Sequence, residues 1–231
     1  ADIKSNNTNE LQFYMLYNYH PPLDPYLDII YCDDDILILN KPSGLLSVPG
    51  KGEHLADCLE SRAKQSFPSA LTVHRLDMDT SGLMVMGLNK FAHRHLSLQF
   101  QNRNVDKTYV ARVYGIFDKE DGMVDLPLIC DWPNRPKQMV DFENGKPSQT
   151  KWRVIKRNEN ETLVQLTPLT GRSHQLRVHM NELGHPILGD RFYAHDEALT
   201  MSDRLCLHST AITVMQPIEK IKLTFEASAP F

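Results

Sequence analysis

Runs of apolar residues separated by polar and turn residues recur along most of this chain, a pattern that is typical of β-strands. Residues 27–41, LDIIYCDDDILILNK, are two apolar runs separated by three aspartates, which predicts a β-hairpin. Further apolar runs bounded by turn residues predict strands in the segments ALTVH, GLMVMGLNK, TYVARVYG, QMVDF, SQTKWRVIKR, ETLVQLTPL, RLCLHSTAITVM and KIKLTFEA.

Three segments show the longer period of helices instead: residues 53–67, 91–104 and 172–184. In the second segment Phe91, Leu96 and Phe100 are predicted to form the inner face, and Gly184 is expected to end the third. Many strands and few helices, without regular alternation, predict an α+β fold with a mainly antiparallel sheet. Residues 1–25 are polar and proline-rich and are expected to form an arm, followed by a single domain over residues 26–231.

Composition narrows the class of protein. The chain has 231 residues, of which 41% are hydrophobic and 23% charged, as in ordinary soluble proteins. Its four cysteines are scattered without a CxxC pair, which disfavours a zinc ribbon or a disulfide framework and favours a reducing compartment. Without an apolar run of membrane-spanning length or a signal-peptide pattern, the expected location is the cytoplasm and no membrane partner is expected.

Charge is unevenly distributed along the chain. The formal net charge is −4, yet residues 90–180 contain 15 lysines and arginines against 10 aspartates and glutamates. A basic middle between acidic flanks is able to build a positive face for nucleic acid on an acidic protein. Ordinary scatter of charges explains the same counts, so charge alone leaves both interpretations open.

Residues 77–82, DMDTSG, contain the Asp-x-Asp-x-Thr pattern of phosphotransferases that use an aspartate nucleophile. That chemistry needs a buried apolar strand before the nucleophile and further groups that hold Mg²⁺. Here His74 and Arg75 precede Asp77, and no nucleotide-binding or metal-binding motif accompanies it. A match of five residues with two free positions is weak, so we do not favour this interpretation.

Ionisable and hydrogen-bonding side chains are dense in a few short segments: HRLDMDTSG, DKTYVARVYG, LTGRSHQLRVHM and RLCLHS. In the third, helical spacing places Ser173, Arg177 and Met180 on one stripe. An arginine that faces inward needs a carboxylate partner, for which Asp77 is a candidate, and pairing would keep that carboxylate ionised. The alternative is an Arg–Asp pair that only braces the fold.

These four segments resemble the pseudouridine synthases of the large-subunit-rRNA type, whose hallmark is His-Arg-Leu-Asp-x-x-Thr-Ser-Gly. The motifs occur in the family's order, and the resemblance extends from about Leu27 to the C-terminus. The segments KPSGLLSVPG and DLPLICDWPNRPKQ are similar to those of members that modify both large-subunit rRNA and tRNA. Ser173 stands where the family often has Thr and Ser209 where Ala is usual, and neither change affects the expected chemistry.

The resemblance implies a mixed, largely antiparallel sheet with flanking helices and a central RNA-binding cleft, and an enzyme that needs no cofactor and no metal. Asp77 would open the glycosidic bond of a uridine that is flipped out of its RNA, and the base would rotate and rejoin through C5. Tyr109 would stack on the uracil and help to remove the C5 proton, and Arg177 would pair with Asp77.

Substrate contacts are implied as well: Arg75 would touch the RNA and Leu207 would lie near the target base. Further candidates for substrate binding are His74, Arg172 and Gln175. The family leaves the position of Asp79 free, so the substitution Asp79→Ala is expected to keep most activity. A non-catalytic RNA-binding module is the alternative function. Partners are expected to be large-subunit rRNA, a tRNA anticodon stem-loop or both, and the protein is expected to be a monomer.

Overall fold

The computed structural model describes residues 18–231, which form two compact units. The larger unit comprises residues 21–111 and 204–231, and the smaller unit comprises residues 112–203 with residues 18–20. Among residues 18–231 no helix combines the length and the apolar character that crossing a membrane requires. Most of the predicted arm lies outside the described residues, and the single domain expected over 26–231 stays a prediction.

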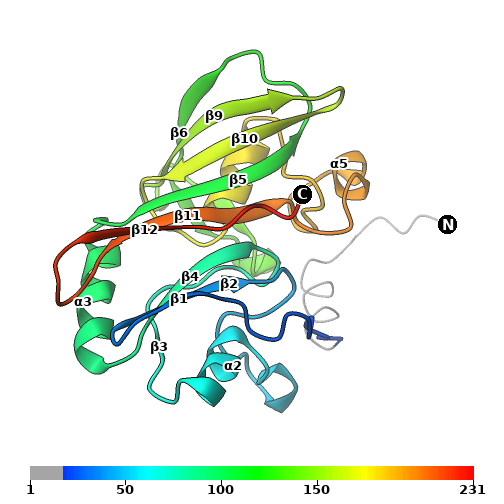
Figure 1. Ribbon diagram of the computed structural model, residues 1–231. Helices are drawn as coiled ribbons and strands as arrows, with labels where there is room; N and C mark the ends of the chain where they lie inside the picture. The colour runs from blue at the N-terminus through cyan, green and yellow to red at the C-terminus, as the bar shows by residue number, and fades with distance from the viewer. Residues whose placement is uncertain (1–17) are drawn as a thin grey trace. The chain divides into compact units, whose positions relative to one another are not determined.

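The larger unit is built on a sheet with the strand order β1-β2-β4-β11-β5 (Figure 1). Its strands are β1 (Ile29–Cys32), β2 (Ile36–Lys41), β4 (Ser81–Gly87), β5 (Asp106–Tyr114, up to Ala111 in this unit) and β11 (Leu207–Met215). Two short additions are β12 (Lys222–Glu226), which pairs with β11, and β3 (Leu71–Thr72), which pairs with β4. β4 and β11 run parallel and the other pairs antiparallel, and β1 with β2 forms the predicted hairpin.

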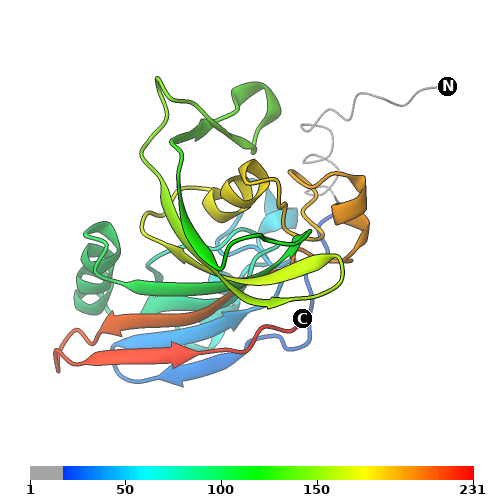
Figure 2. The same ribbon diagram turned by 90° about the horizontal axis from the view of Figure 1, so that it is seen from above.

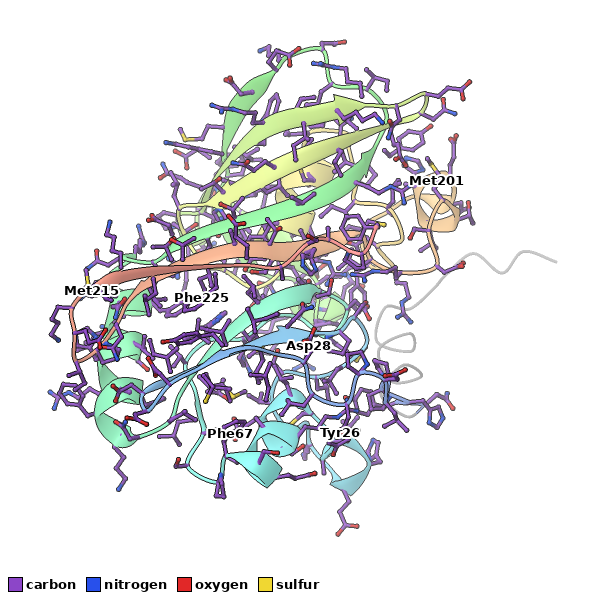
Figure 3. All side chains as sticks on the ribbon, viewed as in Figure 1. Tyr26, Asp28, Phe67, Met201, Met215 and Phe225 are labelled. Carbon is purple, nitrogen blue, oxygen red and sulfur yellow. The ribbon has the colours of Figure 1, made fainter. Side chains whose placement is uncertain are left out.

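Helices of the larger unit are η1 (Glu53–Leu55), α2 (Leu59–Ser66) and α3 (Lys90–Gln101). Helix α3 lies beside the sheet (Figure 2) and helps to enclose a core of aliphatic side chains, Ile36, Ile38, Leu83, Val85, Leu96, Val105, Ile212 and Val214. Phe225 of β12, labelled in Figure 3, extends this core, with its ring 4.9 Å from that of Tyr31.

The inner face of α3 differs in part from the prediction. Leu96 is fully buried and Phe100 is partly buried, as expected, but Phe91 is 56% exposed. Ala92 takes the predicted place of Phe91, because residues four apart lie above one another on a helix and Ala92 aligns with Leu96. The side chain of Asn89 caps the helix by accepting a hydrogen bond from the backbone N–H of Ala92 at 2.8 Å.

The smaller unit contains an antiparallel sheet in the order β10-β9-β6 and a separate β7–β8 ribbon. The strands are β6 (Asp121–Asp125), β7 (Leu128–Cys130), β8 (Gln138–Val140), β9 (Gln149–Arg157) and β10 (Glu161–Pro168). The helices are η2 (Trp132–Asn134), α4 (Gln175–Glu182) and α5 (Asp196–Thr200). Helix α4 contacts β8, β9 and β10, and Figure 2 shows it on one side of this sheet.

Helix α4 begins later than the sequence pattern predicts. His174 adopts a left-handed backbone with φ 54°, so the regular helix starts only at Gln175. Ser173 therefore lies outside the helix, and its predicted place on a stripe with Arg177 is wrong. Gly184, with φ 81°, follows the end of the helix as predicted. The α+β class with a mainly antiparallel sheet is confirmed, whereas the central cleft stays a prediction.

Candidate active site

Asp77 lies in the loop that joins β3 to β4 in the larger unit, and it is half-buried. The loop closes with a turn in which the N–H of Thr80 donates to the carbonyl of Asp77 at 3.1 Å. On the N-terminal side, the hydroxyl of Ser47 donates to the carbonyl of Leu76 at 2.6 Å and accepts from its N–H at 3.1 Å. One side chain therefore satisfies both backbone groups of the residue before Asp77.

The segment that follows β2 binds the other side of this loop. The N–H of Gly44 donates to the carbonyl of Met78 at 2.9 Å, and the hydroxyl of Ser43 donates to the carbonyl of Asp79 at 2.6 Å. These bonds hold the backbone immediately after Asp77. Because hydrogen bonds fix the loop on both sides of Asp77, the sequence KPSGLLS serves as its scaffold.

Lys41 also supports this scaffold. Its side chain is fully buried, and its ammonium donates to three backbone carbonyls, those of Pro42 at 3.0 Å, Leu45 at 2.7 Å and Met78 at 2.9 Å. Burial lowers the pKa of Lys41 to about 7, and the charges of Asp79 and Asp77 oppose that shift. The sequence analysis did not single out Lys41, although the segment KPSG was part of the resemblance.

Gly82 sets the distance between the end of the loop and β11. Its φ is +112°, and a Cβ atom there would lie 2.3 Å from the carbonyl oxygen and 2.5 Å from the nitrogen of Ser209. Only glycine permits this approach, because both obstacles are backbone atoms. In the sheet Ser209 of β11 lies between Gly82 of β4 and Tyr109 of β5 and pairs with both. Gly82, the last residue of the motif HRLDMDTSG, is therefore separated from Tyr109 by a single residue of β11.

Tyr109 is buried and lies close to Asp77. Burial raises the pKa of Tyr109 to about 12; a hydrogen bond with Ser209 opposes this shift, and the negative charge of Asp77 adds to it. The phenol is therefore neutral at physiological pH. The structure brings these two predicted catalytic residues together within one unit, through strand pairing that joins segments far apart in the chain.

His74 and Arg75 precede Asp77 in its loop and differ in their contacts. The Nε2 atom of His74 accepts a hydrogen bond from the N–H of Val85 at 3.0 Å, and its ring stacks on Phe100 with centroids 4.3 Å apart. Burial, followed by the charge of Lys107, lowers the pKa of His74 to about 3, so the ring is neutral. Arg75 is exposed and forms no side-chain hydrogen bond or ion pair with another residue of the described chain.

Residues before and at the start of β11 form a further group of contacts in the larger unit. Leu207 is buried, and the guanidinium of Arg204 donates to the hydroxyl of Ser81 at 2.6 Å. That hydroxyl lies 2.8 Å from Nδ1 of His208, whose Nε2 is 3.1 Å from the carbonyl of Ala227. Since a carbonyl only accepts, Nε2 carries the proton, and Ser81 donates to Nδ1. The hydrogen bonds that link Arg204, Ser81, His208 and Ala227 thus hold the start of β4, the strand that follows the loop of Asp77.

Arg177 lies in the smaller unit and is buried there with Asp190. Its Nε and Nη2 atoms donate to the two carboxylate oxygens of Asp190 at 2.8 and 2.7 Å. The rings of Phe192 and Tyr193 lie 5.2 and 5.3 Å from the guanidinium carbon. The sequence analysis did not single out Asp190, although the segment LGDRFY that contains it could have indicated it. The pairing of Arg177 with Asp77 stays a prediction.

Gln175 and Arg172 lie at the N-terminal end of α4. The amide of Gln175 accepts from the hydroxyl of Thr170 at 2.7 Å and from the N–H of Arg172 at 3.1 Å. It donates to the carbonyl of Gln149 and the hydroxyl of Thr150 at 2.9 and 3.0 Å. This buried amide fixes the loop before the helix, and direct contact of either residue with substrate stays a prediction. No metal-binding cluster of three or more His, Cys, Asp or Glu residues occurs within residues 18–231.

Comparison with known proteins places this arrangement among RNA-modifying enzymes. A family model described as RNA pseudouridylate synthase matches residues 35–182. The dual-specificity RNA pseudouridine synthase RluA of Escherichia coli K12 is 54% identical over 215 residues, which cover 93% of this chain and 98% of that protein. The protein of the same name from Haemophilus influenzae is 52% identical over 217 residues, 94% of this chain and 99% of its own.

Solved structures show the same similarity. The human RNA pseudouridylate synthase domain containing 1 superposes with a TM-score of 0.75 at 29% identity, over 89% of this chain and 84% of that one. The human RNA pseudouridylate synthase domain containing 4, at 24% identity, shares the fold with a TM-score of 0.71 over 95% of this chain and 94% of its own.

Proposed function

This chain belongs to the RNA pseudouridylate synthase family, and we propose that it converts selected uridines to pseudouridine both in large-subunit rRNA and in a tRNA anticodon stem-loop. The family and the enzyme class predicted from the sequence, an isomerase that acts on RNA, are confirmed. Dual specificity is supported by the similarity to RluA over almost the whole length of that protein. We place the enzyme in the cytoplasm as a monomer.

The proposed reaction conserves every atom of the substrate. The bond between C1′ and N1 of uridine breaks, the uracil turns, and C1′ joins C5; the proton on C5 leaves and N1 gains one. Asp77 is the carboxylate that assists cleavage of the first bond. The isomerisation consumes no energy source, and the proposal includes neither a metal nor a nucleotide cofactor.

A single observation carries the assignment of Asp77: this carboxylate stands on a loop fixed by hydrogen bonds on both sides, close enough to a buried tyrosine to raise its pKa. Preorganised groups need no rearrangement when the reaction occurs. The ring of Tyr109 offers a stacking surface for a flipped base. Because its pKa is about 12, the phenol is a hydrogen-bond donor in the free enzyme.

The target uridine has to leave its stack before Asp77 can reach the sugar. Arg75 is suited to hold the displaced strand, since it is exposed and is not engaged by any other described residue. We propose that Leu207, a buried apolar side chain at the start of β11, lies near the target base. We propose a catalytic role for Arg177, whose guanidinium is braced by Asp190.

The decisive test compares Asp77→Ala and Asp77→Asn with the wild-type enzyme on RNA that carries tritium at C5 of uridine. Both variants should release no tritium while RNA binding persists, and chelation of metals should leave the wild type active. Tyr109→Phe should keep affinity and lose rate, because it retains the ring without the hydroxyl. An Asp77→Ala enzyme with the normal rate would refute the proposal, and a wild type that only binds would identify a non-catalytic module.

The natural targets follow from mapping pseudouridines in RNA of cells that lack this protein. Under the proposal, sites disappear from both large-subunit rRNA and tRNA, and both return when the wild-type gene is restored. Restoration with the Asp77→Ala variant should leave them absent. Loss of sites from one RNA class alone would contradict dual specificity and leave the enzyme class unchanged.

A further inference from the structure

Two basic side chains beside the candidate active site have no acidic partner among residues 18–231. Lys107 lies on β5 two residues before Tyr109, so both side chains leave the same face of the strand, about 7 Å apart along it. Arg103 lies in the connection between α3 and β5. The side chains of Arg103 and Lys107 form no hydrogen bond or ion pair with any other residue of the described chain.

The positive charges of these two residues act on one another. Lys107 is half-buried, and burial followed by the charge of Arg103 lowers its pKa. The charge of Lys107 also lowers the pKa of His74, which stays neutral and leaves the repulsion unrelieved. Asp106 does not compensate, because consecutive residues of a strand point to opposite faces. A half-buried cation that faces another cation is stabilised when an anion binds between them.

The backbone at Arg103 supports the same conclusion independently. Helix α3 ends in a Schellman turn, in which the N–H of Asn104 donates to the carbonyl of Gln99 at 2.8 Å and that of Arg103 to the carbonyl of Phe100 at 3.2 Å. Arg103 occupies the left-handed position with φ 59°, which favours glycine. An arginine at a strained position next to the site indicates that its side chain serves a purpose.

We propose that Arg103 and Lys107 bind a phosphate of the RNA backbone next to the target uridine. This inference rests on the proposed function, because it supplies the phosphate binding that positions an RNA whose base stacks on Tyr109. Arginine and lysine are the usual ligands of backbone phosphates, and such contacts fix register without reading sequence. The pair thereby places the target nucleotide over Asp77 whichever RNA carries it.

The test measures how salt weakens the binding of a synthetic anticodon stem-loop. Each lost phosphate contact should reduce the slope of log affinity against log salt by roughly 0.7 to 0.9. Lys107→Gln and Arg103→Gly should each show this reduction, with roughly tenfold weaker binding at low salt, an order of magnitude that corresponds to one charged hydrogen bond. Arg103→Gly also relieves the strained backbone, so its melting temperature should stay the same or rise by about 2–4 °C.

The chain provides a control at Lys220, another exposed cation with positive φ, 57°, located between β11 and β12, whose ammonium lies 2.8 Å from Nε2 of His95. Lys220→Gly removes the same charge and the same strain and should leave affinity and salt slope unchanged. An unchanged slope in both Lys107→Gln and Arg103→Gly, or an equal reduction in Lys220→Gly, would overturn the phosphate site.

Pseudouridine formation measured in parallel keeps the two proposals distinct. If the wild type releases tritium while the slopes do not change, the phosphate site fails and the proposed function stands. If the wild type binds with the expected slopes but forms no pseudouridine, the proposed function fails. Asp77→Ala should retain the wild-type slope, since it removes no cation.

Discussion

Gly82 offers the most direct test of how the sheet positions the catalytic loop. In Gly82→Ala the new Cβ would lie 2.3 Å from the carbonyl oxygen, 2.5 Å from the nitrogen and 2.8 Å from the carbonyl carbon of Ser209. All three atoms belong to the backbone of β11, so no side-chain rotation relieves the contact. Strands β4 and β11 have to separate, and Tyr109, which pairs with Ser209 on the other side of β11, moves with that strand.

Two costs add up in this variant. Forcing a residue with a Cβ to a φ of +112° costs about 1–3 kcal/mol. Overpacking a tightly packed core costs about 1–3 kcal/mol more. The sum, about 2–6 kcal/mol, is large against a total stability of about 5–15 kcal/mol. We therefore expect Gly82→Ala to lower the melting temperature by roughly 10 °C, since each 1 kcal/mol corresponds to about 2–4 °C at this chain length.

Gly184 provides the matched control for the backbone cost alone. It also has a positive φ, 81°, but a Cβ atom there would meet nothing within 4 Å. Urea denaturation should show a loss of about 1–2 kcal/mol for Gly184→Ala and clearly more for Gly82→Ala. Only Gly82→Ala should also lower the rate of tritium release at temperatures where both variants are folded. Equal losses in stability and equal rates would refute the close approach of β4 and β11.

Three further predictions concern buried charges and a buried histidine. Asp190→Asn should lower the free energy of unfolding by about 3–5 kcal/mol, because it strands the buried charge of Arg177; a loss below about 1 kcal/mol in urea denaturation would contradict this. Burial lowers the pKa of His74 from its ordinary value of 6.5 to about 3. The folded protein therefore has its full stability above pH 6.5 and loses stability as the pH falls towards 3, because the unfolded chain takes up the proton more readily. Over that window the wild type should lose on the order of 3 kcal/mol more than His74→Gln, and parallel curves would exclude the effect. Asp79→Ala should reduce stability by a few kcal/mol, because it removes a negative charge near Lys41. The reaction rate of the folded variant should stay within about tenfold of the wild type. A rate as low as that of Asp77→Ala would assign catalysis to both carboxylates.

Local patterns in the sequence predict most strands and helices because each rests on its own residues. Apolar runs bounded by turn residues locate β2, β4, β5 and β9–β11 to within a few residues, and the period of 3.6 locates α3. Failures occur where local conformation interrupts the period. The left-handed backbone of His174 interrupts the helical geometry, so α4 starts later than the pattern predicts. The acidic strand β6 has no clear pattern, because it lacks the apolar alternation of its neighbours.

The sequence analysis named candidate residues for the site, but it did not predict the contacts that support them. Asp77 and Tyr109 are 32 positions apart in the sequence, and they meet because β11, which contains Ser209, lies between β4 and β5. No local pattern encodes that strand order. The ammonium of Lys41 reaches the carbonyl of Met78, 37 residues away, and such contacts become visible only when the sheet is formed.

Asp79 has a structural role that its place in the motif does not reveal. The sequence alone suggested that its carboxylate was coincidental, since the family leaves this position free. In the structure Asp79 is 6% exposed, and its negative charge raises the pKa values of both Lys41 and Arg204 against the effect of burial. Lys41 binds the backbone on one side of Asp77, and Arg204 binds Ser81 on the other. Asp79 is therefore a counter-charge for the two cations that hold the loop, which explains why this carboxylate is buried.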